Sequence, residues 1–386
     1  MQALLECCCG IDVHRDMVEV CILKGLSDEP QIIRSQFKTT KSELVKLADF
    51  LFCNDCFHIS MESTGVYWRP VYEAIEDHSQ YYENMFVVNA HHMRNLPGRK
   101  SDVKDAEWIA TLMRYGLLEA SFVPDRIIRD LREFSRFHKS LVGERTRHIN
   151  RLEKFLQTHG FKLSSVMSNI ICVSGRNLLN TLAQNGTLSS EDVLSAVDKR
   201  LRTPIDEIEA SVCGSINEPE KFLLNLILKK IDDAQSDINS ILAKMQSLTS
   251  SFENELSIID SIPGIDKVAA LTILGEIGNT PNTSFDSSEK LVSWAGLSPR
   301  NDESAGKIKS RKTLHGNPYI KSILCQVAWS AVRSRNSHFH NWFWSHQGKL
   351  GRKKAIIAVA RKILKLIFKL LSCNELYDPE KAMLVA

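Results

Sequence analysis

Residues 7–13, CCCGIDV, form an apolar run that holds a single charged side chain, Asp12. An apolar run of this length between polar residues is typical of a strand covered on both faces of its sheet. A carboxylate beside such a strand is costly unless it has a partner or a function. The stretch therefore predicts a buried strand and marks Asp12 as a candidate site residue.

The segments after residue 13 predict the remaining elements of one α/β domain. Apolar alternation predicts strands, and helical spacing of apolar residues predicts helices. The strands are expected at residues 17–24, 31–37, 57–61 and 84–89, and the helices at residues 42–52, 66–77 and 102–115. Ser42 is expected to be an N-cap. Three antiparallel strands followed by alternating helices and strands predict an RNase H-like (RuvC-like) domain over residues 1–120.

Four acidic residues are expected to converge in this domain. Asp12 lies on the first strand, Glu62 at the end of the fourth, and Asp102 and Asp105 three residues apart on one helical face. Mg²⁺ takes oxygen ligands, and clustered carboxylates repel one another without a counter-charge. The four residues therefore predict a catalytic Mg²⁺ site that polarises a phosphodiester. Taken alone, each has an ordinary alternative, such as Asp102 as a first-turn helix acid.

The sequence becomes helical after Pro124. Residues 125–159 and 220–247 predict two long amphipathic helices, and the stretch from 161 to 219 between them is less regular. Two such helices indicate either a dimer-forming coiled coil or a hairpin within one protomer. We expect this helical linker and dimerisation region to span residues 121–255.

A mostly α-helical domain is expected over residues 256–386. The sequence SIPGI at residues 261–265 lies between two helical patterns. This is typical of a helix-hairpin-helix element, whose glycine lets backbone N–H groups approach a phosphate.

The distribution of charge indicates a nucleic-acid partner for the C-terminal part. Between Arg300 and Cys373 there are 16 Lys and Arg residues against two acids, whereas 14 acids face seven bases between Thr187 and Asp260. An ion-paired or solvated helix face is the alternative for the arginines before residue 150. The candidate contacts are Arg129, Arg132, Arg136, Arg147, Arg300, Lys307, Lys309, Arg311, Lys312, Arg352 and Lys353. Residues 342–344, WFW, fit either base stacking or a packed corner.

Cysteines and hydropathy indicate a cytoplasmic protein. The sequence has ten cysteines, but Cys53 and Cys56 form a CxxC without a second pair, so reduced, packed thiols are expected. We expect no signal peptide in residues 1–10 and no membrane partner, because residues 355–371 carry four basic side chains.

Six motifs in a fixed order carry a family resemblance. They are GIDVHRD, MESTGVY, KSDVKDAEWIA, SIPGI, AGLSPRNDESAG and HGNPYIKSIL. In this order they resemble the transposases of insertion sequence family 110, also called DEDD recombinases, and the related pilin-gene invertases. The resemblance spans nearly the whole chain, and residues 161–219 resemble an extension of longer members.

The resemblance implies a DNA transposase or site-specific recombinase. It implies that Asp12, Glu62, Asp102 and Asp105 bind Mg²⁺ and that Ser304 forms a covalent link to DNA. The two groups are expected to act together from different protomers, in dimers that pair into tetramers. The implied partners are donor and target double-stranded DNA and a structured noncoding bridge RNA that guides their choice. The implied place is the bacterial cytoplasm, at the nucleoid during activity.

The sequence departs from the family motifs at two places, and other functions also remain compatible with it. Ala305 stands where glycine or serine is frequent, and TLH precedes Gly316 where a more basic run is usual. Ser304 alone would be an ordinary loop or capping serine. A DNA invertase of the same family is one alternative function. A Mg²⁺-dependent junction-resolving nuclease would leave Ser304 without a role, and a non-catalytic nucleic-acid-binding protein would predict the loss of at least one of the five residues.

Overall fold

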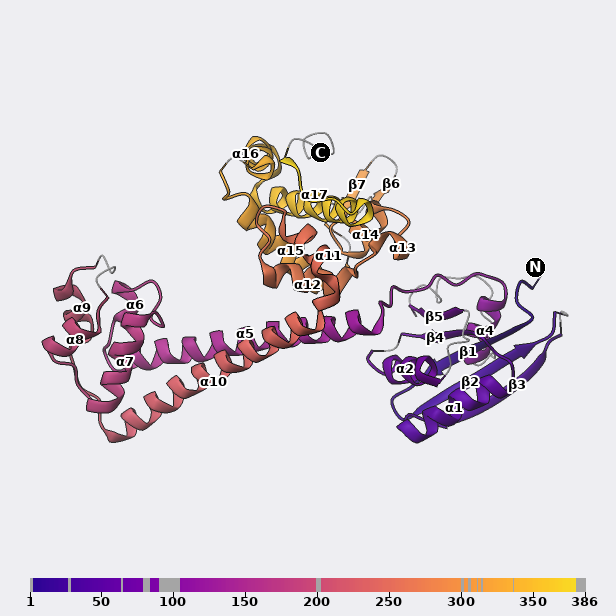
Figure 1. Cartoon of the computed structure of the whole chain (residues 1–386), viewed down its shortest axis with the longest axis horizontal. Coiled ribbons are helices and arrows are strands. Elements are labelled where there is room, and N and C mark those ends of the chain that lie inside the picture. The colour runs from indigo at the N-terminus through magenta and orange to yellow at the C-terminus, as the bar shows by residue number, and fades with distance from the viewer. Residues whose placement is uncertain are drawn as a thin grey trace. The chain divides into compact units, whose positions relative to one another are not determined.

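The chain forms two compact units, residues 1–123 and residues 124–386, in a computed structural model (Figure 1). Each unit is described by itself. The structure describes residues 3–26, 29–63, 65–78, 84–89, 105–198, 203–299, 302–304, 307–310, 312–313, 315–335 and 337–379.

A five-stranded mixed sheet forms the centre of the N-terminal unit. Its strands are β1 (Cys7–Val13), β2 (Met17–Lys24), β3 (Gln31–Lys38), β4 (His58–Glu62) and β5 (Asn84–Val88). The order across the sheet is β3-β2-β1-β4-β5. β1 pairs antiparallel with β2 and parallel with β4, with Gly10 opposite Ser60. The predicted strands are confirmed, as is the expectation that the first and fourth strands are neighbours.

Helices cover both faces of this sheet, which is why β1 is buried from Cys8 to Val13. Helices α1 (Lys41–Cys53) and α2 (Trp68–His78) pack with Cys9, Ile11 and Val13 in one core. Helix α4 (Asp105–Arg114) packs on the other face, against Cys8. Because side chains alternate along a strand, Asp12 points to the face that carries α4.

The predicted N-cap of α1 is wrong. The helix begins at Lys41, and Thr40 occupies the N-cap without a capping side-chain hydrogen bond. Two polar residues on either side of Lys41, Thr40 and Ser42, offered similar signals, and the strand before the helix ends two residues earlier than Thr40. The start of the predicted helix at residues 102–104 lies outside the described residues.

Two long helices, α5 (Arg126–Thr158) and α10 (Glu218–Leu248), run side by side in the second unit (Figure 1). They form a hairpin within one chain, which was one of the two predicted arrangements. Between them lie α6 (Leu163–Val166), α7 (Val173–Asn185), α8 (Ser190–Ala196) and α9 (Ile205–Ser211). The stretch expected to be irregular therefore folds as short helices around a core that includes Phe161 and Leu224.

The remainder of the second unit is mostly helical, as predicted. Its elements are η1 (Ser250–Phe252), α11 (Glu253–Asp260), α12 (Lys267–Ile277), α13 (Pro281–Ser284), α14 (Ser288–Trp294), β6 (Asp302–Ser304), β7 (Lys307–Ser310), α15 (Pro318–Ala331), α16 (His338–Leu350) and α17 (Arg352–Cys373). Helix α17 packs against α14, α15 and α16, with Val359 and Ile363 fully buried, while α12 packs on α5. Within the described ranges, no helix is both long and apolar enough to cross a bilayer.

Candidate active site

Three of the four predicted carboxylates lie on elements at the central strand of the N-terminal unit. Asp12 lies on β1 and is 7% exposed, Glu62 ends β4, and Asp105 is the first residue of α4. Burial raises the pKa of Asp12; His14 opposes this shift, whereas Glu62 and Asp105 add to it. The Nε2 atom of His14 lies 3.1 Å from Oδ2 of Asp12. The three acids are therefore close enough to interact, while Asp102 lies outside the described residues.

The chemistry of these donors fits a hard divalent cation. Carboxylate oxygens are the ligands that Mg²⁺ prefers, and a bound cation would offset the repulsion that raises the pKa of Asp12. In the portion of the chain that the structure describes, no three His, Cys, Asp or Glu residues lie so that they could hold a metal ion together. That portion lacks Asp102, the fourth predicted ligand.

Glycine at position 10 lets α4 cross β1 next to Asp12. A side-chain carbon at Gly10 would overlap the carbonyl oxygen of Ala106 and the backbone nitrogen of Ala110. Asp105 stands one residue before this close contact. Within the sequence GID, Gly10 thus allows the close approach of α4, and Asp12 is the carboxylate next to which α4 places Asp105.

Ser304 lies on a two-stranded antiparallel hairpin of the second unit. It ends β6 and pairs with Lys307, the first residue of β7, with Lys309 further along β7. An isolated bridge between Pro299 and Thr313 closes the hairpin at its base. The predicted contacts Arg300 and Arg311 lie outside the described residues, and Lys312 is exposed.

Two glycines hold the base of this hairpin together. A side-chain carbon at Gly316 would overlap the backbone of Gly296, so the motifs AGLSP and HGNP lie against each other. Lys321 strengthens the junction, because its Nζ donates to the Gly296 carbonyl at 2.9 Å and to Oγ1 of Thr313 at 2.7 Å. Sequence reasoning missed Lys321, and its signal was only its place in the motif HGNPYIK.

Three of the four arginines predicted on α5 are engaged inside the fold. Nη1 of Arg129, a buried residue, donates to the Pro124 carbonyl at 3.0 Å. Arg132 donates to the carbonyl of Gly275 at 3.0 Å, and burial lowers its pKa to about 10, which keeps it charged at neutral pH. Arg136 forms an ion pair with buried Glu276. The ion-paired alternative thus fits Arg132 and Arg136, and their contact with nucleic acid stays a prediction.

The remaining basic candidates lie at the surface. The Arg147 side chain is 64% exposed, with Glu144 3.7 Å away. Arg352 and Lys353 are exposed at the start of α17, where the guanidinium of Arg352 lies 5.8 Å from the ring centre of Trp329.

The aromatic run at residues 342–344 is partly a packed corner. Phe343 is buried, and Trp342 stacks on His346 with 4.2 Å between ring centres. Only Trp344 of the three is exposed, at 53%.

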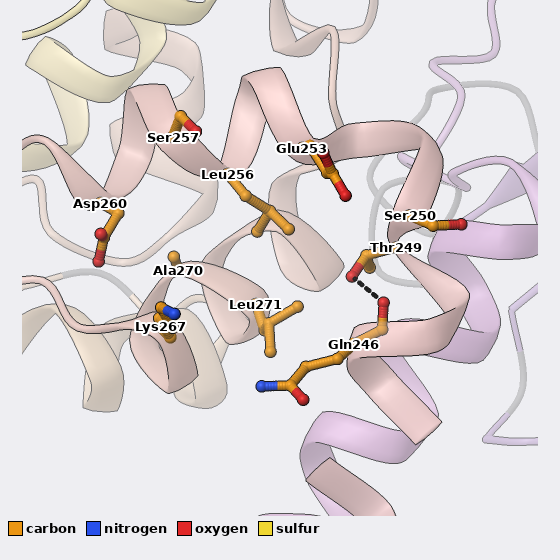
Figure 2. Close-up of a pocket in the computed structure, with 10 residues that line it drawn as sticks. All are labelled: Gln246, Thr249, Ser250, Glu253, Leu256, Ser257, Asp260, Lys267, Ala270 and Leu271. Carbon is orange, nitrogen blue, oxygen red and sulfur yellow. Dashed lines mark hydrogen bonds between the residues drawn. The ribbon is translucent and has the colours of Figure 1, made fainter. Parts of the chain in front are cut away.

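Helices α11 and α12 form a helix–turn–helix around SIPGI. Gly264 has φ +93°, and a side chain there would overlap the backbone of Ala331 on α15. Packing against α15 therefore accounts for this glycine without a phosphate. On α11 and α12, a cavity of about 510 Å³ lies beside the end of α10 (Figure 2). It is lined by Gln246, Thr249, Ser250, Glu253, Leu256, Ser257, Asp260, Lys267, Ala270 and Leu271, none of them a predicted site residue.

Comparisons with known proteins match both units. A model of the DEDD transposase domain of IS110 elements matches residues 9–160, and a model of the transposase IS116/IS110/IS902 family matches residues 256–343. Transposase y4rJ of Sinorhizobium fredii is 25% identical over 258 residues, and a pilin gene-inverting protein of Moraxella bovis is 27% identical over 150 residues.

These alignments cover 64% and 38% of the chain, and 58% and 46% of the respective relatives. The chain thus spans about half the length of the curated relatives that it matches. The two family models flank residues 161–255, so the helices α6 to α9 lie outside both. Since the two models describe successive parts of one kind of transposase and occur here in order, the chain belongs to the IS110 family of transposases and recombinases.

Proposed function

We propose that the chain is the DNA recombinase of an insertion sequence and that it cuts and rejoins DNA through a covalent link to Ser304. The observation that carries the proposal is that the charges of Glu62 and Asp105 both act on the buried Asp12, although the three acids belong to separate elements of one unit. The second unit supplies a serine at the end of a hairpin strand next to Lys307. A plain nuclease would need the carboxylates alone.

In this proposal Asp12, Glu62, Asp102 and Asp105 hold Mg²⁺, which would polarise the scissile phosphate when bound. The Oγ atom of Ser304 forms a bond to phosphorus, and the bond from phosphorus to the DNA oxygen breaks. The serine proton leaves, and the departing DNA oxygen gains a proton. Rejoining reverses this exchange with the hydroxyl of the new DNA strand, so no net hydrolysis occurs.

The proposal extends to fold details and partners. The sheet order supports an RNase H-like (RuvC-like) N-terminal domain, and α11 and α12 support a helix-hairpin-helix element. The partners are donor and target DNA, a structured bridge RNA, and further copies of the chain in a dimer and tetramer, in the bacterial cytoplasm. The candidate contacts are Arg147, Arg300, Lys307, Lys309, Arg311, Lys312, Arg352 and Lys353.

A labelled suicide DNA that carries an end of the element tests the serine. Wild-type protein should retain the label on a denaturing gel, and Ser304→Ala should retain none. An adduct of unchanged yield with Ser304→Ala would refute the serine link. If DNA is cut by both proteins and leaves free ends, the junction-resolving nuclease is the correct alternative.

A DNA invertase is the second candidate, because one relative is named a pilin gene-inverting protein. The chemistry at Ser304 would be the same. A plasmid with two inverted recombination sites distinguishes the two functions, since an invertase reverses the segment between them and a transposase moves it.

A further inference from the structure

Glu276 is a fully buried carboxylate near the end of α12. Its Oε1 accepts from Nε of Arg136 at 2.8 Å, and its Oε2 accepts from Nη2 of Arg136 at 2.9 Å. Oε2 also accepts from Nδ2 of Asn317 at 2.6 Å. Arg132 adds a second positive charge and donates to the Glu276 carbonyl at 2.8 Å. Both carboxylate oxygens are thus paired, as a buried charge requires.

Arg136 is itself held in place. Its guanidinium lies 4.1 Å from the ring centre of Tyr319, which Lys139 also approaches at 5.3 Å. A planar guanidinium that stacks on a ring and forms a two-pronged bond to a carboxylate has one favoured orientation. The cluster therefore fixes the Glu276 carboxylate between α5 and α15.

Asn317 connects this cluster to α15. A carboxylate only accepts hydrogen bonds, so Glu276 requires the Nδ2 side of the Asn317 amide to face it. The Oδ1 side then points at the start of α15, where it accepts from the backbone nitrogens of Tyr319 at 2.9 Å and Ile320 at 3.3 Å. Glu276 thereby selects the amide orientation that caps the helix.

The same asparagine lies at the base of the Ser304 hairpin. Its backbone nitrogen donates to the Trp294 carbonyl at 3.1 Å, which ties the segment after the hairpin to the segment before it. The close packing of Gly316 on Gly296 lies beside this bond. Any shift of Asn317 would thus move both segments that lead into the hairpin.

We infer that Glu276 is a positioning residue for Ser304, because it fixes Asn317 and with it the base of the hairpin that carries the serine. The inference rests on the proposed function of Ser304. An apolar cluster of similar volume would hold three helices together at least as well. A charged cluster also fixes the orientation of its side chains, since a displaced Asn317 or Arg136 would leave the buried Glu276 carboxylate without its partner.

Glu276→Gln tests the inference because it keeps the size of the side chain and removes its charge. The control is Glu289→Gln, which removes a surface carboxylate paired with Lys365 in the same unit. We would measure adduct formation at saturating suicide DNA, the Kd for DNA, and hydrogen exchange at the Gly296 and Asn317 amides. All measurements are made well below the melting temperature of each protein.

Glu276→Gln should slow adduct formation by about 10- to 100-fold, as expected for a nucleophile displaced by a fraction of an ångström. The Kd for DNA should change by less than about threefold, since no predicted DNA contact is altered. The Asn317 amide should exchange faster. Glu289→Gln should match the wild type in all three measurements.

Asn317→Ser is a second variant for the case in which Glu276→Gln does not fold. Serine still caps α15 but cannot reach Glu276, so the same slow adduct formation is expected. A normal rate in either folded variant overturns the inference, even if its melting temperature is lower. If Ser304→Ala keeps the adduct, the proposed function fails instead, and hydrogen exchange still shows whether Glu276 holds the hairpin.

Discussion

Asp12 is a buried carboxylate whose position lowers the stability of the folded protein. Burial raises its pKa, and so do three neighbouring acids, Glu62, Asp105 and Glu19, although His14 opposes them. A carboxyl with a raised pKa binds its proton more tightly in the folded state than in the unfolded state. The contribution of Asp12 to stability is therefore highest at low pH and is lost as the pH rises through the pKa of Asp12 in the folded protein.

Asp12→Asn should consequently stabilise the metal-free protein at pH 7. We expect the melting temperature to rise by about 2–5 °C, and the gain should shrink as the pH falls below the raised pKa of Asp12. Added Mg²⁺ should stabilise the wild type but not Asp12→Asn. Calorimetry with and without EDTA measures both effects. Equal stabilisation of the two proteins by Mg²⁺ would contradict a metal site at Asp12.

Gly10 is the residue that allows α4 to pack closely on β1 beside Asp12. Gly10→Ala should destabilise the N-terminal unit by about 2–4 kcal/mol, because the new methyl group would push α4 from β1. Gly348→Ala is the control, since nothing lies within 4 Å of a side-chain carbon there and alanine favours a helix. Urea titration followed by fluorescence measures the change. A wild-type midpoint for Gly10→Ala would show that α4 packs elsewhere.

At the scale of elements, α5 uses its arginines in different ways along its length. Arg132 and Arg136 lie on the face that packs on α12, and the Arg147 side chain is mostly exposed further along. The first pair holds a buried acid, and Arg147 is left as the candidate contact for RNA or DNA.

Paired substitutions separate these roles. Arg136→Ala should lower the free energy of unfolding by about 3–5 kcal/mol, because Glu276 would lose its main partner. Arg147→Ala should change it by less than about 0.5 kcal/mol and should reduce the salt dependence of nucleic-acid binding. Denaturation and binding titrations at several salt concentrations measure the two effects. A stable Arg136→Ala protein with weakened binding would reverse the assignment.

The sequence predicted elements well where a pattern is local. The apolar runs beside Asp12 and Glu62 located their strands, and α5 begins and ends within one residue of the predicted range. Helical spacing places Arg132 and Arg136, which are four residues apart, on one face of α5. It did not reveal that α12 covers this face, because the partner, Glu276, is 140 residues away from Arg136.

Distant partners also explain what was missed elsewhere. The role of Gly316 depends on Gly296, and that of Gly264 on Ala331, so neither was visible in its own motif. Helices α6 to α9 are short and share one core with α5 and α10. Helices α6, α8 and α9 have four to seven residues each, too few to show a clear period, which is why much of residues 161–219 looked irregular. The longer helix α7 has buried residues at helical spacing, and sequence reasoning missed it.

At the scale of the whole molecule, the proposed chemistry is divided between the two units. Asp12 belongs to the first unit and Ser304 to the second. If Asp12 and Ser304 act from different protomers, an assembly can still contain a complete site when one copy lacks the carboxylate and another lacks the serine. Such a division makes activity depend on assembly.

Mixing Asp12→Asn with Ser304→Ala should therefore restore adduct formation, although each variant alone is inactive. Mixed assemblies contain sites in which an intact carboxylate set meets an intact serine. The readout is label retained on co-expressed protein, compared with the two variants assayed separately. Mixed protein as inactive as its components would place both halves of the site on one chain.

Helices α6 to α9 enter from the end of α5 and leave into the start of α10, and Thr187 bridges Ser215 within them. Their hydrophobic core draws only on the adjoining turns of those two helices, such as Leu156 and Leu228. We therefore expect that this segment can be lengthened, shortened or replaced without disturbing the β6–β7 hairpin that carries Ser304. The same independence makes the segment a suitable insertion site for a fluorescent reporter or an affinity tag.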